Sequence, residues 1–453
     1  MLYLENMENN MANVYISFLG TSKYIPCIYY DKNGNQVQVE RFVQQATITI
    51  NCNDWNDQDR VLIFTTKEAY QKNWLDNGHN DGSEGLEKCL QNMNLQARVQ
   101  QIDIPSGNNE NEIWEIFSIV YGSINMEDAI IFDITHAFRS IPMLAIIILN
   151  YAKFMKNVSL KGIYYGAFEA LGKNPKEALA MDISKRRIPI FDLTAFDNLL
   201  EWSSAVDQFV NAGNAKPIGL LAKKSANIVL KESKGKEQWA RDIKSLGNHI
   251  EDFSLSLATC RCAEISNNVK RLNDNITRCI NIEHIKPLQP VFHRVKSHLD
   301  QFDGSDVIID GLNAAKWCLN HNLIQQSVTI LLETLISFWL IKANQKLDDS
   351  QTRELVNKSI TIKINDFHEK TWQVKPDQKP LVRNMIEILE NNKELYKQHN
   401  RLNQMRNDIN HCGTSEHTKK ASDFEKVLNK IFDEIEGNNL LGTNINKKNG
   451  GLQ

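Results

Sequence analysis

Short apolar runs alternate with segments of helical spacing over the first 195 residues. The runs predict strands at Val14–Leu19, Ile28–Tyr30, Gln36–Glu40, Gln45–Ile50, Val61–Thr65, Arg98–Ile104, Ala129–Phe132, Leu160–Tyr165 and Ile188–Leu193. Helical spacing follows from Lys67, over Glu110–Tyr121 and over Ser140–Met155. Asn33-Gly34 predicts a hairpin turn, because both residues accept positive φ. Strands that alternate with helices favour βαβ units and a parallel sheet.

The pattern changes near residue 196, after which strand-like runs become scarce. Long segments then repeat at helical spacing, namely Leu199–Val210, Ile218–Val229, Val328–Ile341, Leu381–Leu389 and Phe424–Ile435. We therefore expect an α/β, Rossmann-like N-terminal domain over 1–195 and an all-α C-terminal domain over 196–453.

Composition and charge agree with a folded protein of two functional parts. The 453 residues are 42% hydrophobic and 24% charged, which excludes a wholly disordered or collagen-like chain. The formal net charge is −3. Residues 1–200 contain 17 basic and 24 acidic residues, and residues 201–453 contain 35 and 31. The first part is thus acidic and the second mildly basic, which hints at two functional units.

Cysteine usage and hydropathy favour a soluble protein of a reducing compartment. None of the eight cysteines forms a C-x-x-C pair, and Cys260 and Cys262 lack the spacing of a zinc site. The first ten residues are polar and acidic, unlike a signal peptide. The apolar run Ile141–Leu149 is shorter than the roughly 20 residues that span a bilayer. We expect a cytoplasmic protein without a metal site or membrane segment.

Three polar loops follow predicted strands, where open parallel sheets bind ligands. They are Gly20–Tyr24, Ser106–Asn109 and Asp133–Ser140. The first offers glycine, two hydroxyls and an ammonium group, yet matches neither G-x-G-x-x-G nor a Walker A loop. The third runs into a helix start, which favours an anion. Ordinary turns and helix caps would give the same residues, and Asp133 suits a cap better than a ligand contact.

The helical half carries Arg406-Asn407-Asp408-Ile409-Asn410-His411-Cys412-Gly413. Arginine and histidine suit metal-independent RNA cleavage, in which imidazole transfers protons and guanidinium stabilises the phosphate. Five residues correspond to about 140° around an ideal helix, so one face does not hold both side chains. A helix end or a subunit interface would bring such groups together, and Gly413 predicts a helix end. Alternatively, His411 is a helix-end histidine favoured by the dipole.

With these residues the chain resembles the CARF–HEPN ribonucleases of type III CRISPR systems, in the branch called the TM-eighteen-twelve-like family. The resemblance rests on FLGTSKY (Phe18–Tyr24), the loop with Gly107, DITHAFRSIP (Asp133–Pro142), YYGA (Tyr164–Ala167) and RNDINH (Arg406–His411). A second arginine–histidine pair, Arg278 and His284, matches no family motif and is a chance match.

The resemblance implies a CARF sensor that binds cyclic oligoadenylate and a HEPN domain that cleaves single-stranded RNA. The implied ring-binding residues are Gly20, Thr21, Ser22, Lys23, Gly107, Thr135, His136, Arg139 and Tyr165. The implied catalytic residues are Arg406, Asn407 and His411, in a cleft shared by two chains. It also implies a homodimer or higher oligomer, and a functional link to a type III CRISPR effector complex without stable binding. No cofactor is expected.

Several alternatives stay open. Cyclic tetra-adenylate is the favoured activator and cyclic hexa-adenylate the second choice. The Asn-rich stretches Gln45–Asn56 and Asn73–Glu84 suggest insertions around the sensor pocket and leave the ring size open. The helical half could be a regulator or scaffold without nuclease activity. The sensor could also degrade its own ligand, with His136 or Lys23 as contributors.

Overall fold

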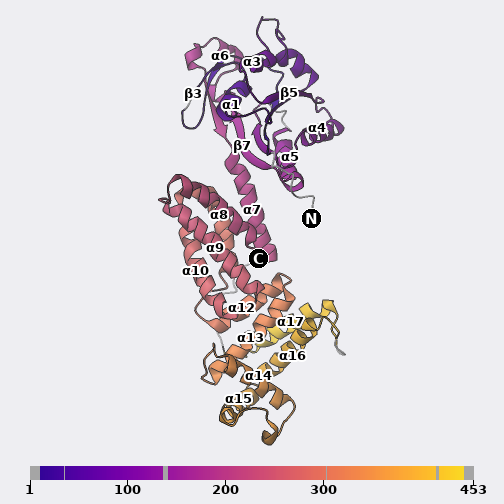
Figure 1. The fold of residues 1–453 in the computed structure, drawn as a ribbon, viewed down its shortest axis with the longest axis vertical. Helices are drawn as coiled ribbons and strands as arrows, with labels where there is room; N and C mark the ends of the chain where they lie inside the picture. The colour runs from indigo at the N-terminus through magenta and orange to yellow at the C-terminus, as the bar shows by residue number, and fades with distance from the viewer. Residues whose placement is uncertain (1–10, 35, 136–140, 303, 415–417, 443–453) are drawn as a thin grey trace. The chain divides into compact units, whose positions relative to one another are not determined.

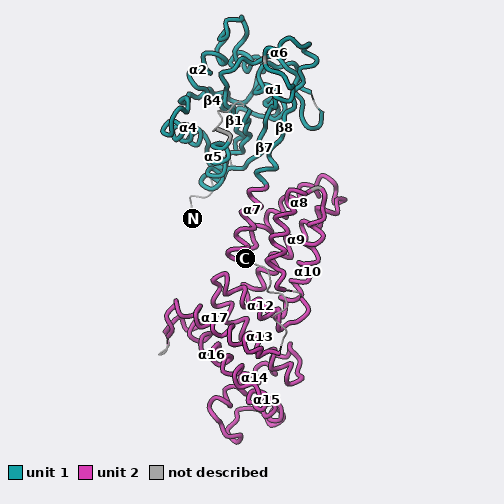
Figure 2. Tube along the Cα trace, turned by 180° about the vertical axis from the view of Figure 1, so that it is seen from behind, with its two compact units in different colours: residues 1–198 teal, residues 199–453 magenta. Residues whose placement is uncertain are grey.

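The computed structural model describes residues 11–34, 36–135, 141–302, 304–414 and 418–442. The chain divides into two compact units, residues 1–198 and 199–453 (Figures 1 and 2). The first unit combines a sheet with helices, and the second is helical throughout its described residues. Each unit is described separately below.

One eight-stranded mixed sheet forms the centre of unit 1. Its strands are β1 (Asn13–Leu19), β2 (Cys27–Tyr30), β3 (Gln36–Glu40), β4 (Arg60–Thr65), β5 (Arg98–Asp103), β6 (Ala129–Asp133), β7 (Ser159–Gly166) and β8 (Arg187–Asp192), in the order β3-β2-β8-β7-β6-β1-β4-β5. From β7 to β5 all neighbours are parallel, as the alternating pattern predicts. The pairs β7–β8 and β2–β3 are antiparallel, whereas β2–β8 is parallel, so the sheet is mixed outside this core. The β2–β3 turn contains Gly34 at φ +80°, which fits the predicted hairpin.

Helices cover both faces of this sheet. They are α1 (Val43–Asn51), α2 (Lys67–Ala69), α3 (Leu86–Asn92), α4 (Glu110–Gly122), α5 (Ile141–Lys156) and α6 (Pro175–Leu179), with a π-helical turn at Tyr70–Trp74 and 3-10 turns at Phe168–Leu171 and Ile183–Lys185. Alternate residues of β1 point to opposite faces. Ile16 packs with α4 and α5, whereas Tyr15 packs with α1, the π-helical turn and α3. The sheet is therefore the middle of three layers.

The strand expected at Gln45–Ile50 is wrong, since these residues lie in helix α1. Its β-branched residues favour strand locally, but tertiary contacts override that preference. Gln44 donates hydrogen bonds to the Ser17 hydroxyl and the Phe18 carbonyl of β1. Val43 and Ala46 are buried in the cluster that includes β2 and β8. The helix thus buries polar as well as apolar side chains against the sheet.

Unit 2 consists of helices only over its described residues. They are α7 (Thr194–Ala212, which starts in unit 1), α8 (Lys216–Glu232), α9 (Gln238–Ala258), α10 (Cys262–Ile280), α11 (Gln289–Leu299), α12 (Val307–Asn320), α13 (Ile324–Lys342), α14 (Ser350–Ile364), α15 (Lys379–Asn391), α16 (Lys393–Asn410) and α17 (Ala421–Gly437), with 3-10 turns at Glu283–Leu288, Glu369–Thr371 and Pro376–Gln378. The five helical segments predicted here fall within α7, α8, α13, α15 and α17.

Helix α13 packs in the core of unit 2. It is long and apolar enough to cross a membrane by composition, yet 67% of its most apolar window is buried inside the unit. Leu331, Leu335 and Trp339 are fully buried and belong to the large core cluster of the unit. Burial against neighbouring helices explains its apolar sequence, because a helix hydrophobic all round needs cover on every side.

A buried carboxylate ties the centre of unit 1 together at the end of β6. Asp133 Oδ2 accepts hydrogen bonds from the hydroxyls of Tyr15 at 2.9 Å and Ser17 at 3.2 Å. Asp133 Oδ1 accepts from the backbone N–H of Thr135 at 3.0 Å and from its hydroxyl at 2.6 Å. Thr47 Oγ1 of α1 lies 2.6 Å from the Tyr15 hydroxyl. Burial raises the pKa of Asp133, and the hydrogen bonds from Thr135, Tyr15 and Ser17 oppose that rise.

Replacing Tyr15 by phenylalanine is expected to destabilise the strand pair β1–β6. The change leaves a buried carboxylate short of one donor, which costs about 1.5–3 kcal/mol for a hydrogen bond to a charged group. Hydrogen exchange of peptides covering β1 and β6, followed by mass spectrometry, measures this loss as a lower free energy of local opening. Tyr29→Phe is the control, because the buried Tyr29 makes no hydroxyl hydrogen bond to any described residue. Equal exchange in both variants would contradict the role of Asp133 as an anchor.

Candidate functional site

The first candidate site lies at the carboxyl ends of β1 and β6, which are neighbouring parallel strands. Their register pairs Ser17 with Asp133, so the segments that follow them start side by side. The chain after β6 enters α5 on one face of the sheet, and the chain after β4 enters α3 on the other. Ligands of open α/β sheets bind at such a switch point. Gly20, Thr21, Ser22 and Lys23 therefore share one edge of the sheet with Thr135.

The backbone of the first loop presents unpaired donors. Within the described ranges of the chain, no atom accepts a hydrogen bond from the N–H of Thr21, Ser22 or Lys23. Thr21 is half-buried, whereas Ser22 and Lys23 are exposed. The Lys23 ammonium forms an ion pair with Asp81 at 2.7 Å. This loop can offer N–H groups and hydroxyls to an anion without breaking a hydrogen bond.

The other predicted ring-binding residues differ in placement. Thr135 is already engaged, because its hydroxyl donates to Asp133 and accepts from the N–H of Gly166 at 2.8 Å. Tyr165 lies near the end of β7 and donates to Glu169 at 2.5 Å; burial and then that bond raise its pKa to about 12. Gly107, at φ +72°, follows β5, which β4 separates from β1. His136 and Arg139 lie outside the described residues.

The motifs do not reveal several residues that shape this edge. Tyr15, Ser17 and Thr47 support Asp133 from β1 and α1. Asn73, in the π-helical turn, donates to the carbonyls of Gly20 and Ser22. The Asn-rich composition of residues 73–84 is the sequence signal for that segment, and it does not predict that Asn73 contacts the loop after β1.

The second candidate site is the carboxyl end of helix α16. Arg406 is half-buried; its Nη2 donates to Asn403 Oδ1 at 3.1 Å, and its Nε is buried without an acceptor among described residues. Asn407 is exposed, and its carbonyl accepts the backbone N–H of His411 at 2.9 Å. His411 caps the helix with its side chain exposed. Across the described residues no hydrogen bond joins the side chains of Arg406 and His411, as their spacing predicts.

Helix α16 ends just before Gly413, as the sequence predicts, and Cys412 and Asp408 contribute to this helix end. Cys412 and Gly413 both take positive φ, at 52° and 71°. The buried Asp408 accepts the N–H of Lys419 at 2.8 Å, and its carbonyl accepts the N–H of Gly413 at 3.2 Å. These contacts hold the chain that leaves the helix and so fix the place of His411.

Helix α16 contains a further histidine that sequence reasoning did not single out. His399 is fully buried, and its Nδ1 accepts a hydrogen bond from the indole N–H of Trp339 at 3.2 Å. Burial and then the charge of Arg406 lower its pKa to about 3. His399 is therefore neutral and closed to solvent, so it is unsuited to proton exchange with a substrate, whereas His411 is accessible.

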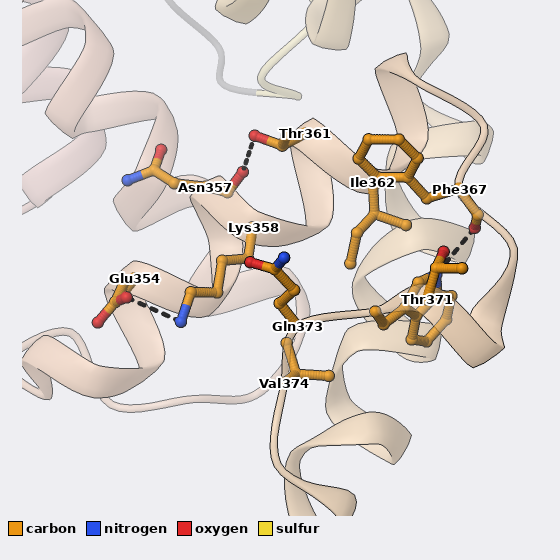
Figure 3. Close-up of a pocket in the computed structure, with 10 residues that line it drawn as sticks. Glu354, Asn357, Lys358, Thr361, Ile362, Phe367, Thr371, Gln373 and Val374 are labelled. Atoms are coloured by element: carbon orange, nitrogen blue, oxygen red, sulfur yellow. Dashed lines mark hydrogen bonds and ion pairs between the residues drawn. The ribbon is translucent and has the colours of Figure 1, made fainter.

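Unit 2 also has a cavity of about 580 Å³ between α14 and the segment that follows it. Figure 3 shows its lining, with Ile362 and Phe367 on one side and the pair Lys358–Glu354, whose charged atoms are 2.8 Å apart, on the other. None of the predicted site residues lines this cavity. Neither Arg406 nor His411 lines the cavity, so we do not assign it to the second candidate site. In the described part of the chain, no group of three His, Cys, Asp or Glu side chains is placed to hold a metal ion.

One solved structure covers most of the chain at low similarity. It is Enterococcus italicus Csm6 bound to cyclic hexa-2'-fluoro-hexa-dAMP, with 11% identity and a TM-score of 0.39. The alignment covers 95% of this chain and 98% of that one.

Sequence comparison gives a closer relationship. Residues 198–305, from α7 to α11, match the family model described as CRISPR-associated protein MJ1674, second domain. Over 367 residues the chain is 26% identical to CRISPR-associated protein MJ1674 of Methanocaldococcus jannaschii, which covers 77% of this chain. The chain spans about half the length of that relative, 50%. Arg406, Asn407 and His411 lie outside the family match. These similarities confirm the predicted resemblance of the chain to CRISPR-associated proteins.

Proposed function

We propose that the chain is a ligand-gated ribonuclease of type III CRISPR defence that acts in the cytoplasm. Unit 1 is a CARF-like sensor for cyclic oligoadenylate, with cyclic tetra-adenylate the preferred ring and cyclic hexa-adenylate the second candidate. Unit 2 is a HEPN-like effector that cleaves single-stranded RNA without a metal. The protein responds to the second messenger of the effector complex and needs no stable contact with that complex.

One observation carries the sensor proposal. The Gly20–Lys23 loop and Thr135 lie at the ends of neighbouring parallel strands, and the N–H groups of Thr21, Ser22 and Lys23 are unpaired within the described chain. Backbone N–H groups and hydroxyls bind phosphate oxygens without a dedicated positive side chain. Such a site explains how an acidic unit accepts a polyanion, because the donors act at close range.

An exposed apolar stripe on α5 supports pairing of two sensors. Met143, Ile147, Tyr151 and Phe154 lie three to four residues apart, and they are between 42% and 87% exposed. Exposed apolar patches mark interaction surfaces. Because α5 follows the Asp133 loop directly, a two-fold contact through α5 would place two copies of the ring-binding edge near one axis. A ring-shaped ligand suits that symmetry.

The proposed chemistry uses the 2′-hydroxyl of the RNA as nucleophile. The His411 imidazole takes the proton of the 2′-hydroxyl as the 2′-oxygen bonds to phosphorus. The P–O5′ bond breaks and leaves a 2′,3′-cyclic phosphate, and a water molecule gives the 5′-oxygen its proton. Arg406 stabilises the charge on the non-bridging oxygens, and Asn407 assists positioning. Since Arg406 and His411 of one helix diverge by about 140°, residues from two chains complete the cleft. The net charge of +4 over residues 201–453 suits an RNA substrate.

Replacing His411 or Arg406 by alanine is expected to abolish RNA cleavage while ring binding is kept. Loss of a general acid–base group costs about 10²–10⁴-fold in rate. The assay follows a fluorescent single-stranded RNA in EDTA, with cyclic tri-, tetra- and hexa-adenylate as activators. His293→Ala is the matched control, since His293 is an exposed histidine elsewhere in the unit.

The same assay separates the alternatives. Cleavage that survives His411→Ala would remove that residue from the mechanism. Ring binding without RNA turnover under any condition would favour a scaffold. Linear oligoadenylate that accumulates in the Arg406→Ala protein would show that the sensor degrades its own ring, independently of the helical unit.

Replacing Phe154 by glutamate is expected to split the dimer and to abolish ring-stimulated cleavage. The side chain is 87% exposed, so the change should not disturb folding of the isolated chain. Sedimentation velocity measures the oligomeric state, and the RNA assay measures activation. Phe367→Glu is the control, since Phe367 is 49% exposed in unit 2. An unchanged dimer in the Phe154 variant would exclude α5 as the contact.

A further inference from the structure

The buried side-chain amide of Asn73 holds the loop Gly20–Lys23 by two hydrogen bonds. Asn73 is 1% exposed and lies in the π-helical turn Tyr70–Trp74, a geometry found often at functional sites. Its Nδ2 donates to the carbonyl of Gly20 at 2.8 Å and to that of Ser22 at 2.9 Å. Carbonyls only accept, so the orientation of the amide is settled by its partners.

These two bonds fix the direction of the loop backbone. A trans peptide is planar, and its N–H points opposite to its C=O. With the carbonyls of Gly20 and Ser22 turned toward Asn73, the N–H groups of Thr21 and Lys23 point away from it. These are two of the donors that have no acceptor among the described residues. Asn73 thus decides which side of the loop presents donors.

The segment after the π-helical turn holds Asn73 in turn. Asn73 Oδ1 lies 3.0 Å from His79 Nε2, which must be the donor because an amide oxygen only accepts. Gly78 lets the chain fold back against the π-helical turn, since a Cβ there would lie 2.3 Å from the carbonyl oxygen of Gln71. The tip of the segment also contacts the loop through the ion pair Asp81–Lys23. Residues 70–85 therefore form a brace for the loop.

We infer that Asn73 is a positioning residue for the phosphate-binding backbone of the sensor, with His79 as its support. The inference rests on the proposed function, because it takes cyclic oligoadenylate as the ligand of the loop. Asn73 does not need to contact the ring. It acts by keeping the N–H groups of Thr21 and Lys23 aimed at the phosphate oxygens before the ligand arrives, which removes the cost of ordering them on binding.

Asn73→Asp tests this role, with Asn77→Asp as the matched control. An ionised aspartate has the shape of asparagine but cannot donate to the two carbonyls. Asn77→Asp adds the same charge in the same segment and keeps its function, since Asn77 Oδ1 accepts from the N–H of Gly82 at 2.8 Å. Isothermal titration with cyclic tetra- and hexa-adenylate should show a Kd at least about tenfold higher for Asn73→Asp, because two hydrogen bonds are lost. Asn77→Asp should stay near wild type.

The titration also separates a positioning defect from misfolding. Misfolded protein lowers the number of sites per chain and leaves the Kd of the folded fraction unchanged, whereas misplaced donors raise the Kd at full stoichiometry. If Asn73→Asp fails to fold, His79→Phe replaces it and should raise the Kd several-fold, since the amide loses its support. Equal Kd values for Asn73→Asp and Asn77→Asp would overturn the inference and leave the proposed function standing. A wild-type protein that binds neither ring would overturn both.

Discussion

The hydrogen bonds to the buried Asp133 carboxylate are the constraint on which the candidate ligand-binding edge of unit 1 depends. A carboxylate without exposure to water must be met by donors, and here they come from β1 and from the loop that follows β6. Moving either segment would leave a buried charge with fewer donors, which costs more than the hydrogen bonds contribute when made. The ends of β1 and β6 are therefore held at a fixed separation by a group that has no need to touch a ligand.

Further hydrogen bonds fix the segments on either side of Asp133. Thr135 links Asp133 to β7, because its hydroxyl donates to the carboxylate and accepts a hydrogen bond from the N–H of Gly166. On the other side, Asn73 holds the loop after β1 by its carbonyls. The hydroxyl of Thr135 and the carbonyls of Gly20 and Ser22 are thus satisfied by the protein. In the loop after β1, the N–H groups of Thr21, Ser22 and Lys23 remain without an acceptor among the described residues, and such groups can bind an anion.

Local patterns predicted the strands of the parallel core because β1, β4 and β6 are continuous apolar runs buried on both faces. They failed for α1, whose β-branched residues pack as a helix through the long-range contacts of Gln44. The loop after β1 and the strand end at Asp133 could be located from sequence, since both follow strand-like runs. Tyr15 and Asn73 could not, because their partners lie 118 and up to 53 residues away and no periodicity encodes such pairs.

The geometry of helix α16 suits the proposed gating of a ribonuclease by a ligand. The exposed His411 stands at the helix end, while Arg406 is half-buried about 140° around the helix, so a single copy does not direct both groups at one phosphate. Neutral, buried His399 cannot substitute for His411. In the proposed mechanism a second helix end supplies the missing group, and the distance between the two helix ends would then control the rate of cleavage. A ring that binds one dimer arrangement better than another needs only to shift that distance, which makes gating a difference in binding free energy between two arrangements.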